Sequence, residues 1–263
     1  MHTLPARYRY RIFSSITALL APIIVTWSSP VAAESALVAV ATNFSEVAQK
    51  LSLDFERGNN HRITLTAGST GKLYAQITNG APFDLLLAAD SERPTVLEKS
   101  GNAVSGTRTV YAIGRLTLWS PDPGLFSTPG REILERGAFR SLAIANPSLA
   151  PYGMAAKQTL QSLGVWESSR NRIVMGENIG QAHAMVATQN VEFGLLALSL
   201  AISSRNDQPG SRWDVPADLH APIYQEAVLL LHGADNPAAR AFLEFLNSNA
   251  ARATIKSFGY DTG

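Results

Sequence analysis

Short apolar runs alternate with segments of helical periodicity along this 263-residue chain, and this alternation limits its fold more than any other feature. Residues 37–41 form an apolar run that leads directly into Thr42 and Asn43, and a helical pattern then continues to Gly58. The same order of strand and helix repeats from Ile63 onward. Strands that are separated by helices form parallel βαβ units, so we expect twisted α/β sheets.

The pattern predicts elements along the whole chain after residue 36. The expected strands are residues 37–41, 63–67, 83–90, 116–119, 142–145, 173–175, 193–197 and 227–231. The expected helices are residues 44–58, 70–79, 94–99, 131–136, 153–163, 179–188 and 237–258, and residues 203–222 are expected to form a polar loop. Two α/β halves fit this order better than one sheet, with lobe I at residues 34–113 plus 223–263 and lobe II at residues 114–222.

The N-terminal 33 residues have the pattern of a cleaved signal peptide. Three arginines, at positions 7, 9 and 11, precede an apolar run at residues 12–27 and a small-residue segment that ends at Ala33. An uncleaved anchor is the alternative, but Pro22 and several serines make the apolar run too short for a typical membrane-spanning helix. We therefore expect residues 1–33 to direct export to the periplasm and to be removed.

Composition excludes several classes of partner. Removing the three arginines of residues 1–33 changes 22 basic against 21 acidic residues into a net charge of about −2, which gives no support to nucleic-acid binding. The chain has no cysteine, so it has neither disulfides nor thiolate metal sites. We expect a monomer with no cofactor.

Four strand-to-helix turns carry small, hydroxyl or amide residues: 42–43, 69–71, 151–153 and 178–180. In open α/β sheets such turns lie at the carboxyl ends of the strands, where ligands bind. The first N–H groups of each following helix have no partner within the helix, so they can bind an anion. Two turns belong to each half, and the one basic residue close to them is Lys72. This arrangement favours a fully ionised oxyanion that is held by neutral donors between the halves.

The turn at residues 66–73 also has two competing interpretations. A nucleotide P-loop would need glycine at position 66 and Ser or Thr at position 73, where this chain has Thr66 and Leu73. The P-loop interpretation is therefore excluded. The other alternative, that Ser69 or Thr70 only caps its own helix, stays open at this stage.

Other polar residues of the chain have simpler interpretations. Asp84 and Asp90 flank a strand and are expected to be caps or hinge contacts rather than ligands. His183 is expected to be a partly exposed helical histidine. An exported hydrolase would need a G-x-S-x-G or H-E-x-x-H motif, and neither is present. The effector half of a transcription regulator is disfavoured because the chain has a signal segment and no basic helix-turn-helix.

Five motifs in family order make the chain resemble the periplasmic molybdate-binding proteins of ABC uptake systems over essentially the whole mature length. The motifs are residues 40–44 (VATNF), 68–77 (GSTGKLYAQI), 80–85 with 88–90 (GAPFDL and AAD), 146–153 (NPSLAPYG, of which NP and APYG carry the likeness) and 177–179 (ENI). The resemblance implies a two-lobed, hinged receptor of the type II periplasmic-binding-protein family. Each lobe would be a mixed, mostly parallel sheet flanked by helices, and the lobes would be joined by a two-segment hinge.

The resemblance also implies a set of ligand residues and a partner. Its oxyanion would be bound by Thr42, Asn43, Ser69, Thr70, Tyr152 and Ile179, with Ile179 acting through its backbone N–H. Threonine at position 70 replaces a serine that is common in the family. Ala197 stands where some members have a tyrosine, so Tyr152 is expected to take that role. The protein would deliver its ligand to the membrane permease of an ABC transporter.

Ligand size is the expected basis of selectivity. Molybdate and tungstate are tetrahedral dianions with longer bonds to oxygen than sulfate or phosphate. A preformed ring of donors that fits the larger pair leaves desolvated donors unpaired around the smaller one. We therefore expect molybdate or tungstate as ligand, with molybdenum present only inside the bound oxyanion. Sulfate or phosphate is the alternative.

Overall fold

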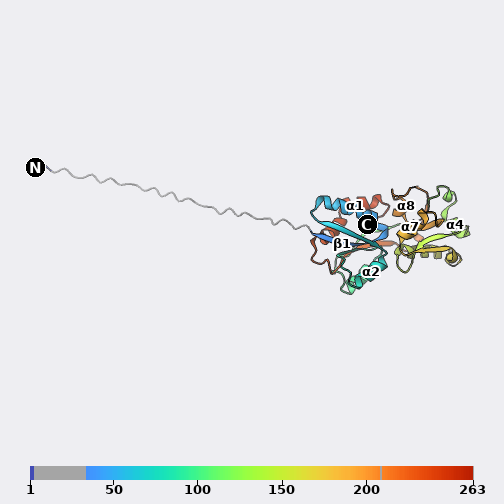
Figure 1. The fold of residues 1–263 in the computed structure, drawn as a ribbon, viewed down its shortest axis with the longest axis horizontal. Coiled ribbons are helices and arrows are strands. Elements are labelled where there is room, and N and C mark those ends of the chain that lie inside the picture. Colours follow the sequence, from blue (N-terminus) through green and yellow to red (C-terminus); the bar gives the residue numbers. More distant parts are fainter. Residues whose placement is uncertain (3–33, 208, 263) are drawn as a thin grey trace. The chain divides into compact units, whose positions relative to one another are not determined.

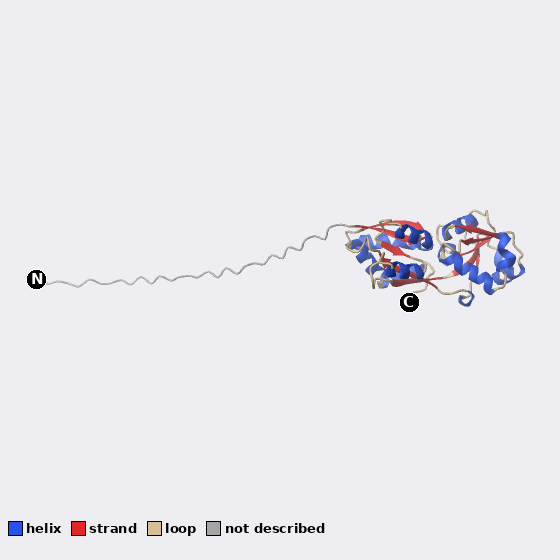
Figure 2. Ribbon diagram, turned by 90° about the horizontal axis from the view of Figure 1, so that it is seen from below, coloured by secondary structure: helices blue, strands red, loops and turns tan. Residues whose placement is uncertain are grey.

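The computed structural model describes residues 1–2, 34–207 and 209–262. The predicted signal peptide, at residues 1–33, therefore lies almost entirely outside the described residues. One compact unit contains every helix and strand that is described, in two five-stranded sheets with helices around each (Figures 1 and 2). We call the first sheet with its helices lobe I and the second lobe II. Among the described residues, no helix has the length and apolar character needed to cross a membrane.

The sheet of lobe I has the strand order β2-β1-β3-β10-β4. The central strand β1 pairs in parallel with β2 and with β3, whereas β10 pairs antiparallel with both β3 and β4. Its strands are β1 Ser35–Ala41, β2 Arg62–Gly68, β3 Leu85–Leu87, β4 Thr109–Gly114 and β10 Ile223–Leu229.

The sheet of lobe II repeats this plan in the order β7-β6-β8-β5-β9. Strand β6 pairs in parallel with β7 and β8, and β5 pairs antiparallel with β8 and β9. Its strands are β5 Leu116–Ser120, β6 Leu142–Ala145, β7 Ile173–Gly176, β8 Phe193–Ala197 and β9 Ser211–Asp214. In each sheet one strand, β10 or β5, opposes the direction of the other four, so both sheets are mixed and mostly parallel, as expected.

The chain passes between the two sheets twice. The first crossing joins β4 to β5 between Gly114 and Leu116, and the second joins β9 to β10 between Asp214 and Ile223. Two neighbouring connections of this kind form the two-segment hinge that the fold class predicts.

Helices flank both sheets (Figures 1 and 2). Those of lobe I are the 3-10 turn η1 Thr42–Phe44 and the helices α1 Ser45–Gly58, α2 Thr70–Thr78, α3 Glu92–Lys99, α9 Pro237–Leu246 and α10 Asn249–Ser257. Those of lobe II are η2 Leu125–Ser127, α4 Gly130–Arg136, α5 Pro151–Ser162, α6 Trp166–Ser169, η3 Arg170–Arg172, α7 Ile179–Ala187, α8 Leu198–Ala201 and η4 Ala217–Leu219.

Strand register places the predicted turns side by side in pairs. Ala41 at the end of β1 is paired with Gly68 at the end of β2, so the turns that follow both strands leave the sheet at the same level. In lobe II, Ala145 at the end of β6 is paired with Gly176 at the end of β7. Each lobe therefore presents two adjacent strand-to-helix turns at one edge of its sheet.

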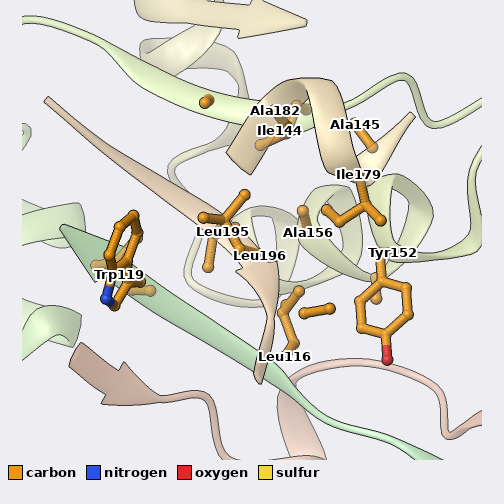
Figure 3. Close-up of a cluster of buried hydrophobic side chains, with 14 of the residues drawn as sticks. Leu116, Trp119, Ile144, Ala145, Tyr152, Ala156, Ile179, Ala182, Leu195 and Leu196 are labelled. Carbon is orange, nitrogen blue, oxygen red and sulfur yellow. The ribbon is translucent and has the colours of Figure 1, made fainter. Parts of the chain in front are cut away.

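Apolar side chains of the strands and helices form a core in each lobe. In lobe I, Leu51 and Phe55 of α1 pack with Phe242 of α9 over β1. Burying a side chain of this size contributes about 1.5–3 kcal/mol. Figure 3 shows the core of lobe II, in which Tyr152 and Ile179 belong to the same cluster as the strand side chains. The apolar parts of these two predicted site residues are thus held by the core.

The predicted secondary structure differs from the structure in several places. Strand β4 was not predicted, and the loop predicted at residues 203–222 contains β9 and η4. The helix predicted at residues 237–258 is two helices. The first ends at Leu246, and Ser248 caps the second, where its side chain accepts a hydrogen bond from Ala251 N at 3.2 Å. The polar strand β9 forms because β5 supplies a backbone partner, which sequence periodicity does not report.

Candidate oxyanion site

The first predicted turn follows β1 without a break and forms η1. The hydroxyl and the methyl group of Thr42 have different surroundings. Its Oγ1 is buried and has no hydrogen-bond partner in the protein. Its Cγ2 packs against Gly180 at the start of α7, where a Cβ would lie only 2.5 Å from that methyl group. The first turn of lobe I and the fourth turn, in lobe II, are therefore in direct contact.

The hydroxyls of the second turn do not cap the helix that follows it. Ser69 is the N-cap residue of α2, yet its side chain makes no capping hydrogen bond, and its buried Oγ has no partner in the protein. Thr70 Oγ1 accepts a hydrogen bond from Ala89 N at 3.1 Å, so the hydroxyl proton of Thr70 remains available to another acceptor. The alternative in which Ser69 or Thr70 caps this helix is therefore wrong.

Unpaired buried hydroxyls are uncommon in proteins, which makes these two informative. Leaving a buried polar group unpaired costs about 1–3 kcal/mol, and most such groups have a partner. Among the described residues, four buried side-chain atoms lack one: Thr42 Oγ1, Ser69 Oγ, Ser169 Oγ and His183 Nε2. Two of the four belong to adjacent predicted ligand turns, where a bound acceptor would satisfy them.

The third turn begins α5, with Pro151 as its first residue and Tyr152 as its second. A Cβ on Gly153 would lie 2.2 Å from Ala145 O, so the helix start lies tightly against the end of β6. The backbone N–H of Tyr152 is one of the helix-end donors that have no partner within the helix. Its hydroxyl is buried elsewhere, where it accepts a hydrogen bond from Gln225 Nε2 at 3.2 Å.

The fourth turn begins α7 and uses its asparagine as a cap. Asn178 Oδ1 accepts a hydrogen bond from Gln181 N at 3.0 Å. Ile179, the next residue, is buried and is the first residue of the helix, so its N–H is also a free helix-end donor. The side-chain cap and the free backbone donors thus share one helix start.

Contacts across the lobes bring the second turn to lobe II as well. Gly71 N donates to Leu149 O at 2.9 Å, and Lys72 Nζ forms an ion pair with Glu177 Oε1 at 2.7 Å. The Arg93 guanidinium also donates to Ser148 O at 3.4 Å. Together with the contact of Thr42 with Gly180, these interactions show lobes that are closed on each other at the four turns.

Asn43 lies in the predicted place, but its side-chain donors are already in use. Its Nδ2 donates to Gln225 Oε1 at 2.9 Å and to the Tyr260 hydroxyl at 3.1 Å. Its backbone oxygen accepts from Tyr260 and from Ser199. Asn43 is therefore held rigidly, and its amide protons are directed away from any additional acceptor.

Burial keeps the three tyrosines of this region neutral. Desolvation raises the pKa of the Tyr111 and Tyr152 hydroxyls well above the ordinary tyrosine value, and it also raises the pKa of Tyr260. Their hydroxyls are therefore protonated at all physiological pH values. They add no charge beside the turns.

The acidic residues near the turns are occupied in structural contacts, as expected. Asp84 accepts from Leu37 N at 2.7 Å and contacts His232 Nδ1 at 2.9 Å. Asp90 accepts from Arg93 N and pairs with the guanidinium of the same residue. In the described part of the chain, no group of three or more His, Asp or Glu side chains is arranged to hold a metal ion.

His183 is half-buried on α7, as predicted. Its ring stacks on Trp119 with 5.2 Å between centroids, and burial lowers its pKa below the ordinary value. It lines a hollow of about 620 Å³ that reaches Thr42 from the side. A second hollow, of about 300 Å³, lies beside Asp90 and Tyr224. Both hollows border the turns, and neither is lined by Ser69 or Thr70.

Sequence reasoning missed four polar residues that hold the site together: Gln225, Tyr111, Tyr260 and Ser199. Ser199 lies two residues after Ala197, and its hydroxyl donates to Asn43 O at 3.1 Å. Gln225 is fully buried in β10, where its neighbours along the strand are Tyr224 and Glu226. These polar neighbours hide the strand from apolar periodicity, so Gln225 had no clear signal in the sequence.

Comparisons with known proteins show to which family the chain belongs. A family model described as bacterial extracellular solute-binding protein matches residues 36–261. The chain is 46% identical over 223 residues to the molybdate-binding protein ModA of Azotobacter vinelandii, covering 85% of this chain and 88% of that protein. It is 41% identical over 233 residues to the molybdate-binding protein ModA of Rhodobacter capsulatus, covering 89% and 90% of the two chains.

Solved structures share the fold. The periplasmic molybdate-binding protein of Azotobacter vinelandii superposes with a TM-score of 0.82 at 37% identity, over 87% of this chain and 99% of that one. The sulfate-binding protein SubI of Mycobacterium tuberculosis superposes with a TM-score of 0.74 at 12% identity, over 86% of each chain. At that identity the second likeness concerns the fold alone.

Proposed function

This chain belongs to the bacterial extracellular solute-binding proteins, and on that premise we propose that it binds molybdate or tungstate between its two lobes. The ligand is held in a donor cage, which we define as the hydroxyls of Thr42, Ser69 and Thr70 with the backbone N–H groups of Tyr152 and Ile179. The relatives reported above are named as binding proteins for molybdate, which supports a binding function for this chain rather than an enzymatic one.

The observation that carries the proposal is the pair of buried hydroxyls without partners, on Thr42 and Ser69. Both follow the ends of neighbouring parallel strands, and Thr70 next to them keeps a free hydroxyl proton. The starts of α5 and α7 in lobe II add N–H groups that have no partner within their helices. An oxyanion at this point would satisfy the donors of both lobes at once.

The chemistry of the cage favours a fully ionised anion. All of its members are neutral donors, and the nearby acidic residues Asp84 and Asp90 are engaged in other contacts. A protonated phosphate would need an acceptor for its O–H group, and the cage offers only hydroxyl oxygens for this, with no carboxylate. The longer bonds of molybdate and tungstate separate these anions from sulfate.

We further propose the roles of the remaining parts of the chain. Lobe I comprises residues 34–113 and 223–263, lobe II comprises residues 114–222, and the separate sheets of the two lobes support this division. Residues 1–33 act as a cleaved signal peptide, and the mature monomer works in the periplasm. It delivers its ligand to the permease of an ABC transporter, without a nucleic-acid partner or cofactor.

Calorimetric titration of the mature protein with molybdate, tungstate, sulfate and phosphate tests the proposal. Molybdate and tungstate are expected to bind with similar affinity, and sulfate and phosphate far more weakly. In thermal unfolding, a ligand at 100 times its dissociation constant should stabilise the protein by about 2.7 kcal/mol. Tight binding of sulfate without molybdate would assign the protein to the other oxyanion.

Thr70→Ala provides the matching test of the site. The variant loses a donor to the ligand, so its affinity for molybdate should fall about tenfold or more. Thr70→Ser keeps the hydroxyl and should retain most of the affinity. If Thr70→Ala binds as tightly as the wild-type protein, the ligand lies elsewhere.

A further inference from the structure

A buried polar network joins the first turn, in lobe I, to the third turn, in lobe II, and Gln225 of β10 lies at its centre. Gln225 Oε1 accepts a hydrogen bond from Asn43 Nδ2 at 2.9 Å and lies 3.1 Å from the Tyr111 hydroxyl, which donates to it. Gln225 Nε2 donates to the Tyr152 hydroxyl at 3.2 Å. One completely buried side chain therefore contacts both turns directly.

A β-bulge positions this network. In the pairing of β10 with β4, Gln225 lies opposite Ala112 and Glu226 lies opposite Val110, so Tyr111 is the extra residue. Bulges redirect side chains and are frequent beside binding sites. Here the bulged residue is buried, and its hydroxyl shares one proton between Gln225 Oε1 and Ala88 O, at 3.1 and 3.0 Å.

Gly114, at the crossing between the sheets, gives the network its space. A Cβ on this residue would lie 2.2 Å from the Tyr152 hydroxyl oxygen and 2.8 Å from Gln225 Nε2. Any side chain here would displace the two groups. The hydrogen bond between the lobes thus depends on a glycine in the hinge.

The orientation of the Gln225 amide follows from counting protons. The Tyr260 hydroxyl lies 2.7 Å from Asn43 O and 2.8 Å from Ser199 Oγ, and Ser199 Oγ lies 3.1 Å from Asn43 O, so these contacts use both hydroxyl protons. Asn43 must therefore donate its Nδ2 protons to Tyr260 and to Gln225. Gln225 then presents its oxygen to Asn43 and its NH₂ group to Tyr152.

We propose that Gln225 is a positioning residue that sets the distance between the first and third turns, and so the selectivity of the donor cage for large over small tetrahedral oxyanions. The inference rests on the proposed function. Because its amide holds Asn43 on one side and Tyr152 on the other, the Thr42 hydroxyl and the Tyr152 N–H cannot move together around a smaller anion. Sulfate then leaves donors unpaired.

The test compares Gln225→Met with the wild-type protein by calorimetric titration with molybdate and sulfate. Methionine fills similar space but cannot make the hydrogen bonds. Affinity for molybdate should fall about tenfold, and the ratio of the sulfate to the molybdate dissociation constant should fall by a similar factor, because the turns are no longer held apart at one spacing. Gln76→Met, on the exposed face of α2, is the matched control and should leave both values unchanged.

A second variant shows whether Gln225 acts through Tyr152. Tyr152→Phe removes only the hydroxyl that Gln225 donates to, and it should lower the same ratio. In the background of Gln225→Met it should have little further effect, whereas two independent contributions would multiply. Tyr152→Phe also keeps the test decisive if Gln225→Met fails to fold.

The outcomes separate the two proposals. If the wild-type protein does not bind molybdate, the proposed function is wrong. If the wild-type protein binds molybdate and Thr70→Ala weakens it, but neither Gln225→Met nor Tyr152→Phe changes the ratio of dissociation constants, then Gln225 has no role in selectivity. A loss of thermal stability alone, with the ratio unchanged, would also overturn the inference.

Discussion

Thr42 combines a polar and an apolar contact in one side chain, and Thr42→Val separates them. Valine keeps the methyl group that packs on Gly180 and removes the unpaired Oγ1. Affinity for molybdate should fall about tenfold or more, while the stability of the ligand-free protein stays constant or rises by as much as ~1–3 kcal/mol. Urea unfolding and calorimetric titration measure the two effects.

The control for this prediction is Thr78→Val at the end of α2. Its hydroxyl is exposed and donates to backbone oxygens of its own helix. Molybdate binding by this variant should equal that of the wild-type protein. A Thr42→Val protein that is destabilised but binds normally would show that Oγ1 serves the fold and not the ligand.

His183 makes stability depend on pH in a defined direction. Burial lowers its pKa below the ordinary value of 6.5, so the unfolded chain binds a proton more readily than the folded protein. The resulting loss of stability begins as pH falls below about 6.5 and is complete below the lowered pKa. Urea unfolding between pH 7.5 and 5 should show a shallower decline for His183→Phe, which keeps the ring contact with Trp119. Equal declines would exclude His183 as the source.

The sequence predicted where the site residues lie along the chain, but not which hydrogen bonds their side chains make. Thr42, Ser69 and Ile179 occupy helix starts, as their neighbours in sequence indicate. The local pattern could not show that Ser69 leaves its own helix uncapped, because that depends on which partner its hydroxyl reaches. It also could not show that Asn43 and Tyr152 direct their polar ends to Gln225, which is more than seventy residues away from both in the chain.

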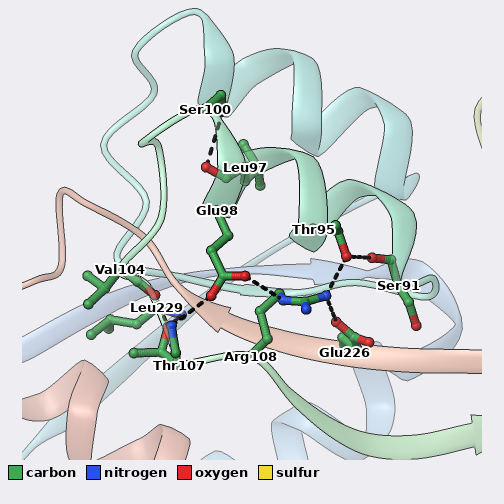
Figure 4. A network of polar contacts seen from close by, with 11 residues as sticks. Ser91, Thr95, Leu97, Glu98, Ser100, Val104, Thr107, Arg108, Glu226 and Leu229 are labelled. Atoms are coloured by element: carbon green, nitrogen blue, oxygen red, sulfur yellow. Dashed lines mark hydrogen bonds and ion pairs between the residues drawn. The ribbon is translucent and has the colours of Figure 1, made fainter.

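Arg108 forms polar contacts between helix α3 and the sheet of lobe I (Figure 4). Its guanidinium pairs with Glu98 at 2.9 Å, contacts Thr95 and pairs with the buried carboxylate of Glu226 at 3.2 Å. A hydrogen bond from Gly106 N, and then Arg108, hold the pKa of Glu98 below its ordinary value. Arg108 therefore connects α3, through Glu98 and Thr95, to β10.

Arg108→Met should destabilise the protein by about 2 kcal/mol, because the carboxylate of Glu226 would stay buried without its partner. Urea unfolding measures the loss. Arg136→Met removes an exposed pair with Glu132 on α4 and should cost less than about 0.5 kcal/mol. If the two variants are equally stable, the connection to β10 contributes nothing.

Helices and strands were predicted well where apolar periodicity is strong. They were predicted poorly where pairing with a neighbouring strand determines the structure. The parallel strands β1, β6 and β8 are apolar and buried, so their sequence alone identifies them. Strand β9 is polar and lies at the edge of its sheet, and it depends on β5. Strand β10 was expected to begin at residue 227, because the polar residues Gln225 and Glu226 near its start are unusual for a central strand.

At the scale of the whole molecule, Gly180 allows the lobes to close. A Cβ at this position would lie 2.5 Å from the Thr42 methyl group. Gly180→Val should therefore hold the lobes apart, increase the radius of gyration measured by small-angle X-ray scattering with molybdate present, and weaken binding about tenfold or more. Gly58→Val is the control, because a Cβ at this position would meet nothing within 4 Å. Gly164 also has open space, but its φ of +72° would strain a residue with a side chain. If Gly180→Val has the same radius of gyration as the wild-type protein when molybdate is present, the prediction is wrong.

The two sheets share one strand plan, and each lobe offers the turns after its corresponding pair of parallel strands. The four donor turns therefore come as two pairs from equivalent places. A tetrahedron also consists of two equivalent pairs of points. Its four corners form two opposite edges, and a twofold rotation axis exchanges these edges. Four-oxygen anions can match this pseudosymmetry edge for edge. Planar nitrate or pyramidal selenite, with three oxygens, would leave one lobe with an unmatched donor, so shape excludes them before size is considered.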